Sequence, residues 1–223
     1  MIAAGIAAHP GRTMVGITGS VAVGKSVAAH EVATLVAGTG RTVSVVCTDG
    51  FLWPNEVLEQ RGLTARKGFP ESFDVEHLRY ALSELAAGRA VTVPAYSHAT
   101  YDVAAGEGTV LEPTEVVIVD GLHLTRFAAD LLDLVVHLDA PTEVLEGWFV
   151  ERLVGLFAEA EDDPSSFYTW AVGLDSAERD AVARSFWTGI NLPNLVECIE
   201  PYRDRADVVI SLAADHTVTA VTR

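Results

Sequence analysis

The chain has 223 residues, of which 49% are apolar and 21% are charged, a composition typical of a globular protein rather than a disordered one. Its 31 acidic residues exceed its 15 basic ones, and the formal charge of -16 makes nucleic acid and membrane surfaces poor partners. Any site for a phosphorylated ligand must therefore be local, built from backbone N–H groups, a few basic side chains and a metal ion.

Cysteine usage and the N-terminal residues bear on the compartment. Cys47 and Cys198 lie far apart without metal-type spacing, which favours reduced thiols and a cytoplasmic location. No apolar run is long enough to span a bilayer. Residues 1–12 lack the basic start of a signal peptide, so we expect a short lead-in to the first strand. Without a repeat or a Pro/Gly linker, we predict a single domain over residues 1–223.

Short apolar runs alternate with helical patterns along the chain. We expect strands at 13–18, 42–47, 115–119, 134–138 and 207–212, the last of them closing the pattern, and helices at 25–37, 74–87 and from about 141 onwards. Asp74 is a suitable N-cap, Gly88 a suitable stop, and Pro141 fits the first turn of a helix. This alternation predicts an α/β fold with a mainly parallel central sheet and helices on both faces.

The most specific motif is the run from Gly19 to Ser26 (GSVAVGKS), which fits GxxxxGK[ST] between a strand and a helix. Its backbone N–H groups can surround phosphate oxygens, Lys25 can reach the β- and γ-phosphates of ATP, and Ser26 can bind Mg²⁺. An accidental glycine turn is the weaker interpretation, because both flanking elements are present. The expected fold is thus a P-loop NTPase-type three-layer sandwich. The predicted nucleotide-binding residues here are Gly19, Ser20, Val21, Ala22, Val23, Gly24, Lys25, Ser26 and Val27.

Two aspartates directly follow predicted strands. Asp120 ends the apolar run 115–119 like a Walker B carboxylate, which makes it a candidate Mg²⁺ ligand together with Ser26. Asp49 follows the run 42–47, which we expect beside the strand that enters the P-loop. Its carboxylate can accept a proton from a substrate hydroxyl or bind the metal, and the sequence leaves both roles open. For each aspartate the simpler interpretation is an Asp-Gly turn.

Further cations are needed to neutralise a transferring phosphoryl group. Arg152 lies in the helix that begins near Pro141, and Arg61, Arg66 and Lys67 follow Asp49. Most such side chains are solvated, so none of them is a strong candidate by itself.

Longer blocks resemble the bacterial type I pantothenate kinases. They are TDGFLWPN (48–55), RKGFPESFD (66–74), PAYSHATYD (94–102) and GINLPNLVE (189–197), which follow the P-loop in the family's order. The resemblance covers about residues 15–216. It implies the P-loop kinase fold shared with uridine kinase and phosphoribulokinase. It also implies transfer of the ATP γ-phosphate to the primary hydroxyl of pantothenate, giving 4'-phosphopantothenate, the first step towards coenzyme A.

Carried over by position, the resemblance implies roles for individual residues. Asp49 matches the catalytic aspartate, Arg152 an arginine near the transferring phosphate, and His216 a histidine at the adenine. The implied catalytic residues are Asp49, Lys25 and Arg152. The implied substrate-binding residues are Asp49, Tyr96, His98, Tyr101, Phe149, Arg152 and Asn191. Alternatively, the two tyrosines are ordinary sheet-edge aromatics and His98 is a structural histidine.

Several positions depart from the family pattern. His30 replaces an arginine, which bears on coenzyme A as a candidate feedback ligand. Phe149 lacks a hydroxyl and Leu153 lacks a ring, so the pocket wall is altered. Asp120-Gly-Leu-His123 replaces Glu-Gly-Leu-Asn. Because the P-loop begins at Gly19, we expect the family's N-terminal extension to be missing. Since the family commonly forms dimers, a homodimer is the candidate assembly.

Pantothenate is the expected acceptor, and two alternatives remain. The altered wall favours another small hydroxyl compound, such as a nucleoside, sugar or glycerate, whereas the intact YSHxxYD block and Asn191 disfavour it. A non-catalytic nucleotide-binding regulator predicts damage at the P-loop or at Asp49, and neither is damaged.

Overall fold

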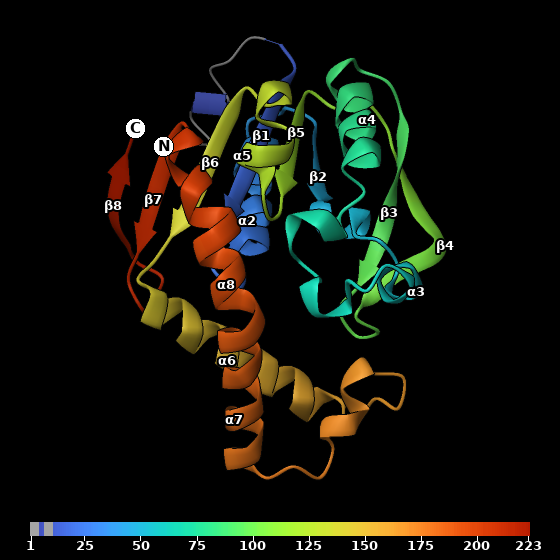
Figure 1. The fold of residues 1–223 in the computed structure, drawn as a ribbon. Helices are drawn as coiled ribbons and strands as arrows, with labels where there is room; N and C mark the ends of the chain where they lie inside the picture. Colours follow the sequence, from blue (N-terminus) through green and yellow to red (C-terminus); the bar gives the residue numbers. More distant parts are fainter. Residues whose placement is uncertain (1–4, 7–10) are drawn as a thin grey trace.

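A central sheet organises the protein in the computed structural model, which describes residues 5–6 and 11–223. In this part of the chain the sheet has six strands in the order β2-β5-β1-β6-β7-β8 (Figure 1). Residues 1–4 and 7–10, most of the predicted lead-in, lie outside the described residues. The strands are β1 (Thr13–Gly19), β2 (Val43–Cys47), β5 (Val116–Asp120), β6 (Leu134–Asp139), β7 (Val208–Leu212) and β8 (Val218–Thr222).

The sheet is mainly parallel, as predicted, but two expectations about it are wrong. β5 lies between β1 and β2, so the strand before Asp49 is not the direct neighbour of the strand before the P-loop. The run 207–212 is not the last strand, because β8 returns antiparallel to β7 through a turn at His216, where φ is 63°. β8 is exposed along its whole length, and the sequence pattern did not separate it from a tail.

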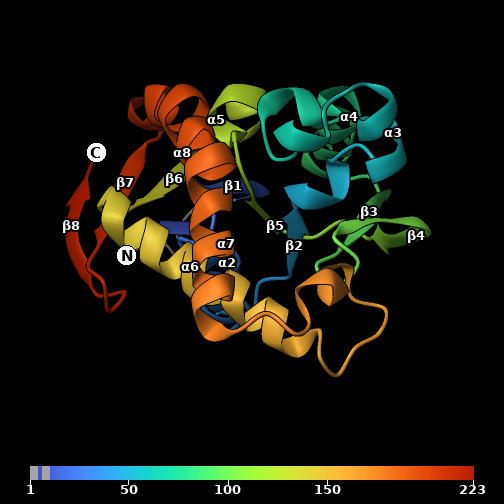
Figure 2. The same cartoon turned by 60° about the horizontal axis from the view of Figure 1, so that its bottom comes forward.

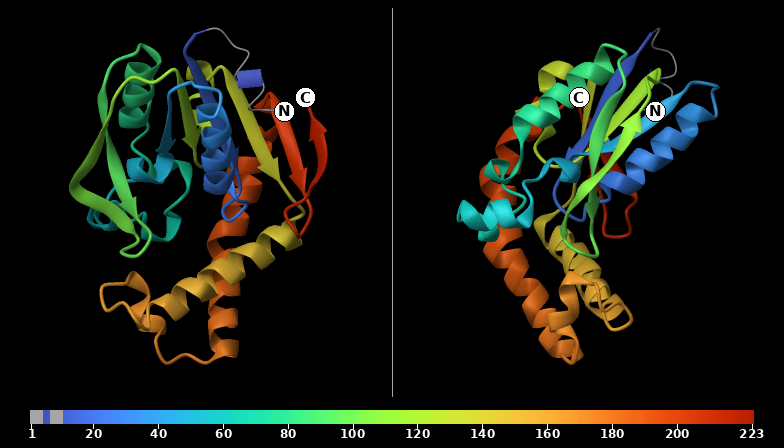
Figure 3. Two further views of the ribbon diagram at one scale, coloured as in Figure 1. Left: turned by 180° about the vertical axis from the view of Figure 1, so that it is seen from behind. Right: turned by 90° about the vertical axis from the view of Figure 1, so that its right-hand side faces the viewer.

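Helices cover both faces of this sheet, which confirms the three-layer arrangement (Figure 3). α2 (Lys25–Ala37) packs on one face against Val15 and Ile17 of β1. α4 (Val75–Ala86) and α5 (Leu124–Phe127) pack on the other face, against Met14 of β1. Successive residues of a strand point to opposite faces, so β1 contributes to both cores and is buried throughout. The remaining helices are α3 (Asn55–Gln60), α6 (Thr142–Glu159), α7 (Ser176–Phe186) and α8 (Leu192–Asn194).

Local signals set the ends of several helices. The carboxylate of Asp74 accepts a hydrogen bond from the backbone N–H of His77 at 3.0 Å, as expected of an N-cap. Gly88 follows the end of α4 with φ at 74°, and α6 begins directly after Pro141. Among the described residues, no helix is both long and apolar enough to cross a membrane.

A separate antiparallel hairpin, β3 (Val91–Ser97) and β4 (Asp102–Leu111), stands beside the central sheet (Figure 1). The sequence pattern does not predict this hairpin, because Pro94 interrupts the first strand and the pairing shifts register between Pro94 and Tyr96. The hairpin and the turn that closes it carry Tyr96, His98 and Tyr101.

The α6–α7 pair extends away from the sheet as an arm, which Figure 3 shows from the side and Figure 2 from the end. A third apolar cluster holds this arm together, centred on Leu153, Phe157 and Tyr168. The chain returns from α7 through π-helical turns at Trp187–Asn191 and Leu195–Ile199, and Trp187 is buried in the core beneath the sheet. The arm thus places α6 at the edge of the sheet where β6 ends, which is also the edge where the parallel strand β1 ends (Figure 1).

Candidate active site

The P-loop and both aspartates lie at one edge of the sheet. β5 pairs in parallel with β1 and with β2, so that Asp120 is the register partner of both Ile17 and Cys47. The chain therefore leaves all three strands at the same edge, at Gly19, Asp49 and Gly121. Ligands collect at the carboxyl ends of strands in open α/β sheets, which makes this edge the candidate site.

The P-loop backbone has a conformation that requires its glycines. Gly19 has φ at 142°, and a Cβ there would lie 2.3 Å from the carbonyl oxygen of Leu138. Gly24, with φ at 93°, precedes the first residue of α2. The amine of Lys25 folds back to donate to the carbonyl of Ser20 at 2.7 Å. The loop thus directs the N-terminus of a helix of 13 residues towards the site, as an anion requires.

Ser26 and Asp120, the two predicted metal ligands, are in direct contact. The Ser26 hydroxyl donates to Oδ2 of Asp120 at 2.5 Å. Asp120 is 2% exposed, and burial raises its pKa, against the opposing effects of the Ser26 hydrogen bond and the Lys25 charge. Within the described residues, no group of three or more His, Cys, Asp or Glu side chains could hold a metal. One carboxylate and one hydroxyl fit Mg²⁺, which takes few protein ligands and completes its shell with water and phosphate oxygens.

The three predicted catalytic side chains share this site. Burial lowers the pKa of Lys25, whereas the negative charges of Asp49 and Asp120 raise it and the positive charge of Arg152 lowers it further. Each of these charges therefore lies within electrostatic reach of the P-loop lysine.

An aromatic wall faces Asp49 from the hairpin. The ring of Tyr96 lies 5.2 Å from His98 and 6.4 Å from Tyr101, centroid to centroid. Burial raises the pKa of Tyr101 to about 12, and the charges of Tyr168 and Asp49 act in the same direction. Burial and the charge of Arg152 lower the pKa of His98. The structure thus brings the three predicted pocket residues together between Asp49 and Arg152.

Lys67 also lies in this site, although its sequence context marks it only as one of three weak candidate cations after Asp49. It is 8% exposed, and its amine donates to Oδ1 of Asn55 at 2.6 Å and to the carbonyl of Tyr101 at 2.5 Å. Burial lowers its pKa to about 8, although Asp102 and Asp49 oppose this. One signal in the sequence could have indicated it. Lys25 and Lys67 are the only two lysines among 15 basic residues, and Lys25 belongs to the P-loop, so the second lysine stands out from the arginines.

The remaining predicted residues lie around this centre. Phe149 packs on Trp187 at 5.8 Å, and the amide of Asn191 donates to the carbonyl of Phe186 at 3.2 Å. His216, in the β7–β8 turn, stacks on Trp148 of α6 with ring centroids 4.0 Å apart and planes at 12°. This stack offers a flat aromatic surface of the kind that binds a nucleotide base.

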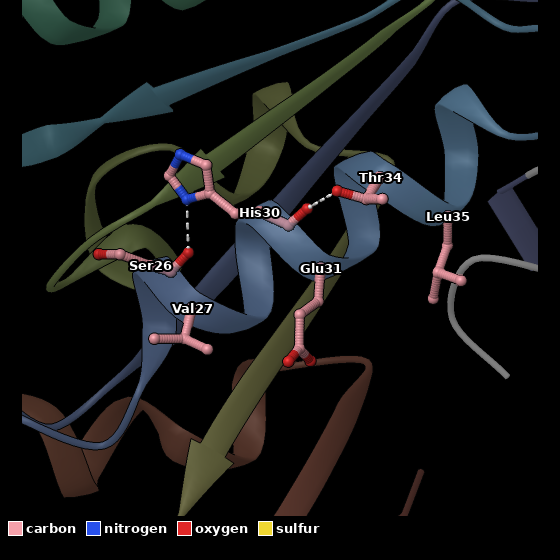
Figure 4. Close-up of a pocket in the computed structure, with 6 residues that line it drawn as sticks. All are labelled: Ser26, Val27, His30, Glu31, Thr34 and Leu35. Carbon is pink, nitrogen blue, oxygen red and sulfur yellow. Dashed lines mark hydrogen bonds between the residues drawn. The ribbon is translucent and has the colours of Figure 1, made fainter.

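The valines of the nucleotide motif differ in exposure. Val23 is buried, whereas Val27 is 64% exposed. Val27 lines a groove of about 690 Å³ along the outer face of α2, which runs from Ser26 past His30 and Glu31 to Leu35 (Figure 4). The ring of His30 folds back onto the helix, where its Nδ1 lies 2.7 Å from the carbonyl oxygen of Ser26. His30 also interacts electrostatically with Asp120, so this histidine lies at the edge of the candidate metal site.

This fold and this site define an ATP-dependent kinase of the P-loop class. The model of the phosphoribulokinase / uridine kinase family matches residues 14–153. A pantothenate kinase of Sorangium cellulosum is 44% identical over 93% of this chain and 71% of its own, and one of Enterococcus faecalis is 38% identical over the same shares. The chain belongs to this family and, within it, to the bacterial type I pantothenate kinases. A D-glycerate 3-kinase from Cryptococcus neoformans shares the fold, with a TM-score of 0.68 at 11% identity over 96% of this chain and 90% of its own.

Proposed function

We propose that the protein transfers the γ-phosphate of ATP to the primary hydroxyl of pantothenate, giving 4'-phosphopantothenate and ADP. The observation that carries the proposal is the position of Asp49. Its charge acts both on Lys25 of the P-loop and on Tyr96 and Tyr101 of the hairpin, so it lies between the nucleotide side and the aromatic wall. An acceptor held against that wall presents its hydroxyl to Asp49 and to the γ-phosphate together.

In the proposed reaction, the acceptor oxygen forms a bond to the γ-phosphorus while the bond from that phosphorus to the β,γ-bridging oxygen of ATP breaks. Asp49 accepts the proton of the hydroxyl, which it later passes to water. Because the transition state is loose, the proton can leave late and a carboxylate is a sufficient base. Lys25 and Arg152 stabilise the charge on the transferring phosphoryl group, and the P-loop N–H groups hold the β-phosphate.

Ser26 and Asp120 would hold Mg²⁺, because their side chains are in contact and each offers an oxygen atom as a ligand. When bound, Mg²⁺ neutralises negative charge on the β- and γ-phosphates. Burial of Asp120 keeps water away from this carboxylate, which would strengthen its interaction with a cation bound in place of the Ser26 hydrogen bond.

We further propose that Lys67, Tyr96, His98 and Tyr101 bind the acceptor, with Asn191 and Phe149 at the rim. The nitrogen of Lys67 lies 4.1 Å from the ring centroid of Tyr101. A buried ammonium beside phenol and imidazole groups suits a small polar acid that carries hydroxyl, amide and carboxylate groups. His216 and Trp148 are proposed to bind the adenine.

Turnover of ATP and Mg²⁺ with purified protein tests the acceptor, with pantothenate compared against uridine, fructose and D-glycerate. We expect ADP release with pantothenate at a kcat/KM at least about 100-fold above that of each other compound, because unpaired polar groups in the pocket penalise a poor fit. Turnover of another compound with pantothenate inert would reassign the acceptor. Absence of turnover with all four would favour a nucleotide-binding regulator.

The finer family expectations are also proposals. We propose that residues 1–223 work as one catalytic domain in the cytoplasm, where the free Cys47 and Cys198 remain reduced. We propose a homodimer, and coenzyme A as a feedback ligand. With His30 in place of the family's arginine, we expect weaker inhibition by coenzyme A.

A further inference from the structure

One backbone carbonyl near the site receives two long-range side-chain contacts. The carbonyl oxygen of Gly68 lies 2.9 Å from Nε2 of His123 and accepts a hydrogen bond from Nδ2 of Asn194 at 2.8 Å. The donors are separated from Gly68 by 55 and 126 residues and lie at the start of α5 and the end of α8. They are 2% and 5% exposed. The fold therefore brings two distant segments onto a single loop atom.

This arrangement leaves polar groups without partners. His123 has φ at 61°, an uncommon conformation for a residue with a side chain. Burial lowers its pKa to about 4, so the ring is neutral and donates through one nitrogen, which faces Gly68. In the described part of the chain, Oδ1 of Asn194 has no hydrogen-bond partner, and Nδ1 of His123 makes no well-formed hydrogen bond, although the backbone of Cys198 interacts with the ring. Strained backbone and unpaired buried atoms are costly and concentrate at functional sites.

The loop that His123 and Asn194 hold at Gly68 carries Lys67. Gly68 has φ at 90°, and its N–H donates to the hydroxyl of Ser72 at 2.9 Å, so both sides of this residue are fixed. The preceding residue, Lys67, reaches from this point to Asn55 and to the carbonyl of Tyr101. Rotation of the backbone at Gly68 would swing the start of the Lys67 side chain out of the pocket.

We infer that His123 and Asn194 are positioning residues, which hold the carbonyl of Gly68 and thereby fix Lys67 beside Asp49 and Tyr101. We call His123 and Asn194, with the carbonyl of Gly68, the clamp. His123 comes three residues after Asp120, so the clamp links the metal side of the site to the loop that carries Lys67. Asn194 comes three residues after Asn191 and links the same loop to the C-terminal helices.

The catalytic part of this inference rests on the proposed phosphoryl transfer. A displacement of about 1 Å in a catalytic group can cost on the order of 100-fold in rate. We therefore expect His123→Ala and Asn194→Ala each to lower kcat with pantothenate by about 10- to 100-fold, with the KM for ATP unchanged within about twofold. His123→Asn should retain most of the activity, because asparagine tolerates positive φ and its amide can donate to Gly68.

The matched control is His137→Ala. His137 is a second buried histidine with an unpartnered Nδ1 among the described residues, but it lies on β6 and outside the clamp. If His137→Ala lowers kcat as much as His123→Ala, the loss reflects general destabilisation and the inference fails.

A direct readout of Lys67 needs no turnover. Since the chain has two lysines, ¹⁵N- and ¹³C-labelled lysine gives two side-chain signals, which Lys67→Met assigns. In both alanine variants of the clamp we expect the Lys67 pKa to rise from about 8 towards the ordinary 10.5, while the Lys25 signal stays in place. An unchanged Lys67 signal in both variants would overturn the inference, as would an undiminished effect of His123→Ala in a Lys67→Met background.

Because this readout is independent of activity, the two proposals can fail separately. If the wild-type protein does not phosphorylate pantothenate but the clamp variants release Lys67, the positioning role stands and the proposed acceptor falls.

Discussion

Replacing Gly121 by alanine should push apart the two loops that carry Asp49 and Asp120. A Cβ on Gly121 would lie 1.6 Å from Oγ1 of Thr48 and 2.6 Å from its Cβ. Rotation about χ1 of Thr48 can move the hydroxyl, but not the Cβ. The backbones on both sides are held, since the N–H of Gly121 donates to the carbonyl of Ile17 at 3.1 Å and Thr48 directly follows β2.

The size of the effect follows from these distances. To reach an ordinary contact of 3.4 Å from 2.6 Å, the two backbones must separate by about 0.8 Å. Overpacking of this kind costs about 1–3 kcal/mol of unfolding free energy. Because Thr48 and Gly121 are the chain neighbours of Asp49 and Asp120, the carboxylates move apart by a similar distance. We expect kcat to fall by about 10- to 100-fold.

Steady-state ADP release and urea unfolding measure the two effects. Gly155→Ala is the matched control, because a Cβ there meets nothing within 4 Å and Gly155 is an exposed residue of α6. This control should keep its activity and gain up to about 1 kcal/mol of stability. If Gly121→Ala keeps kcat within twofold and unfolds like the wild type, the packing of Thr48 on Gly121 does not set the carboxylate positions.

Three further predictions follow from single side chains. Asp49→Asn should lower kcat by at least about 100-fold and leave the Kd for ATP, measured by calorimetry, within about twofold; retained turnover would remove Asp49 as the base. Since burial lowers the pKa of Lys67 from 10.5 to about 8, the unfolded chain binds more protons between these values, and stability rises with pH there. Relative to Lys67→Met, the wild type should therefore gain up to about 3 kcal/mol between pH 8 and 10.5 in urea unfolding, and a constant difference would contradict the shift. His216→Ala should raise the KM for ATP by about 3- to 10-fold through loss of the stack on Trp148, with an unchanged KM for pantothenate. A raised KM for pantothenate with an unchanged KM for ATP would assign His216 to the acceptor side instead.

Much of the site was accessible from the sequence because its signals are local. The P-loop is a contiguous run whose glycines and lysine have fixed spacing, and Asp120 ends an apolar strand. Asp49 likewise follows a strand directly, so its place at the carboxyl edge was predicted even though β5, rather than β1, is its neighbour. The caps of α4 and α6 are equally local and were predicted at Asp74 and Pro141.

The tertiary structure alone decided what depends on distant segments. Lys67 is buried because Asn55 and the turn at Tyr101 close over it, and neither contact is visible in the segment around Lys67 itself. The β3–β4 hairpin and β8 form through cross-strand pairing. The sequence of a short, interrupted or exposed strand has only a weak hydrophobic pattern, so these strands could not be predicted from their own residues. The positioning role inferred for His123 depends on the contacts that the start of α5 and the end of α8 both make with Gly68. The phosphate site is predictable because it depends on local conformational preferences of a contiguous segment. The position of Lys67 is not, because it depends on packing between segments that are distant in the sequence.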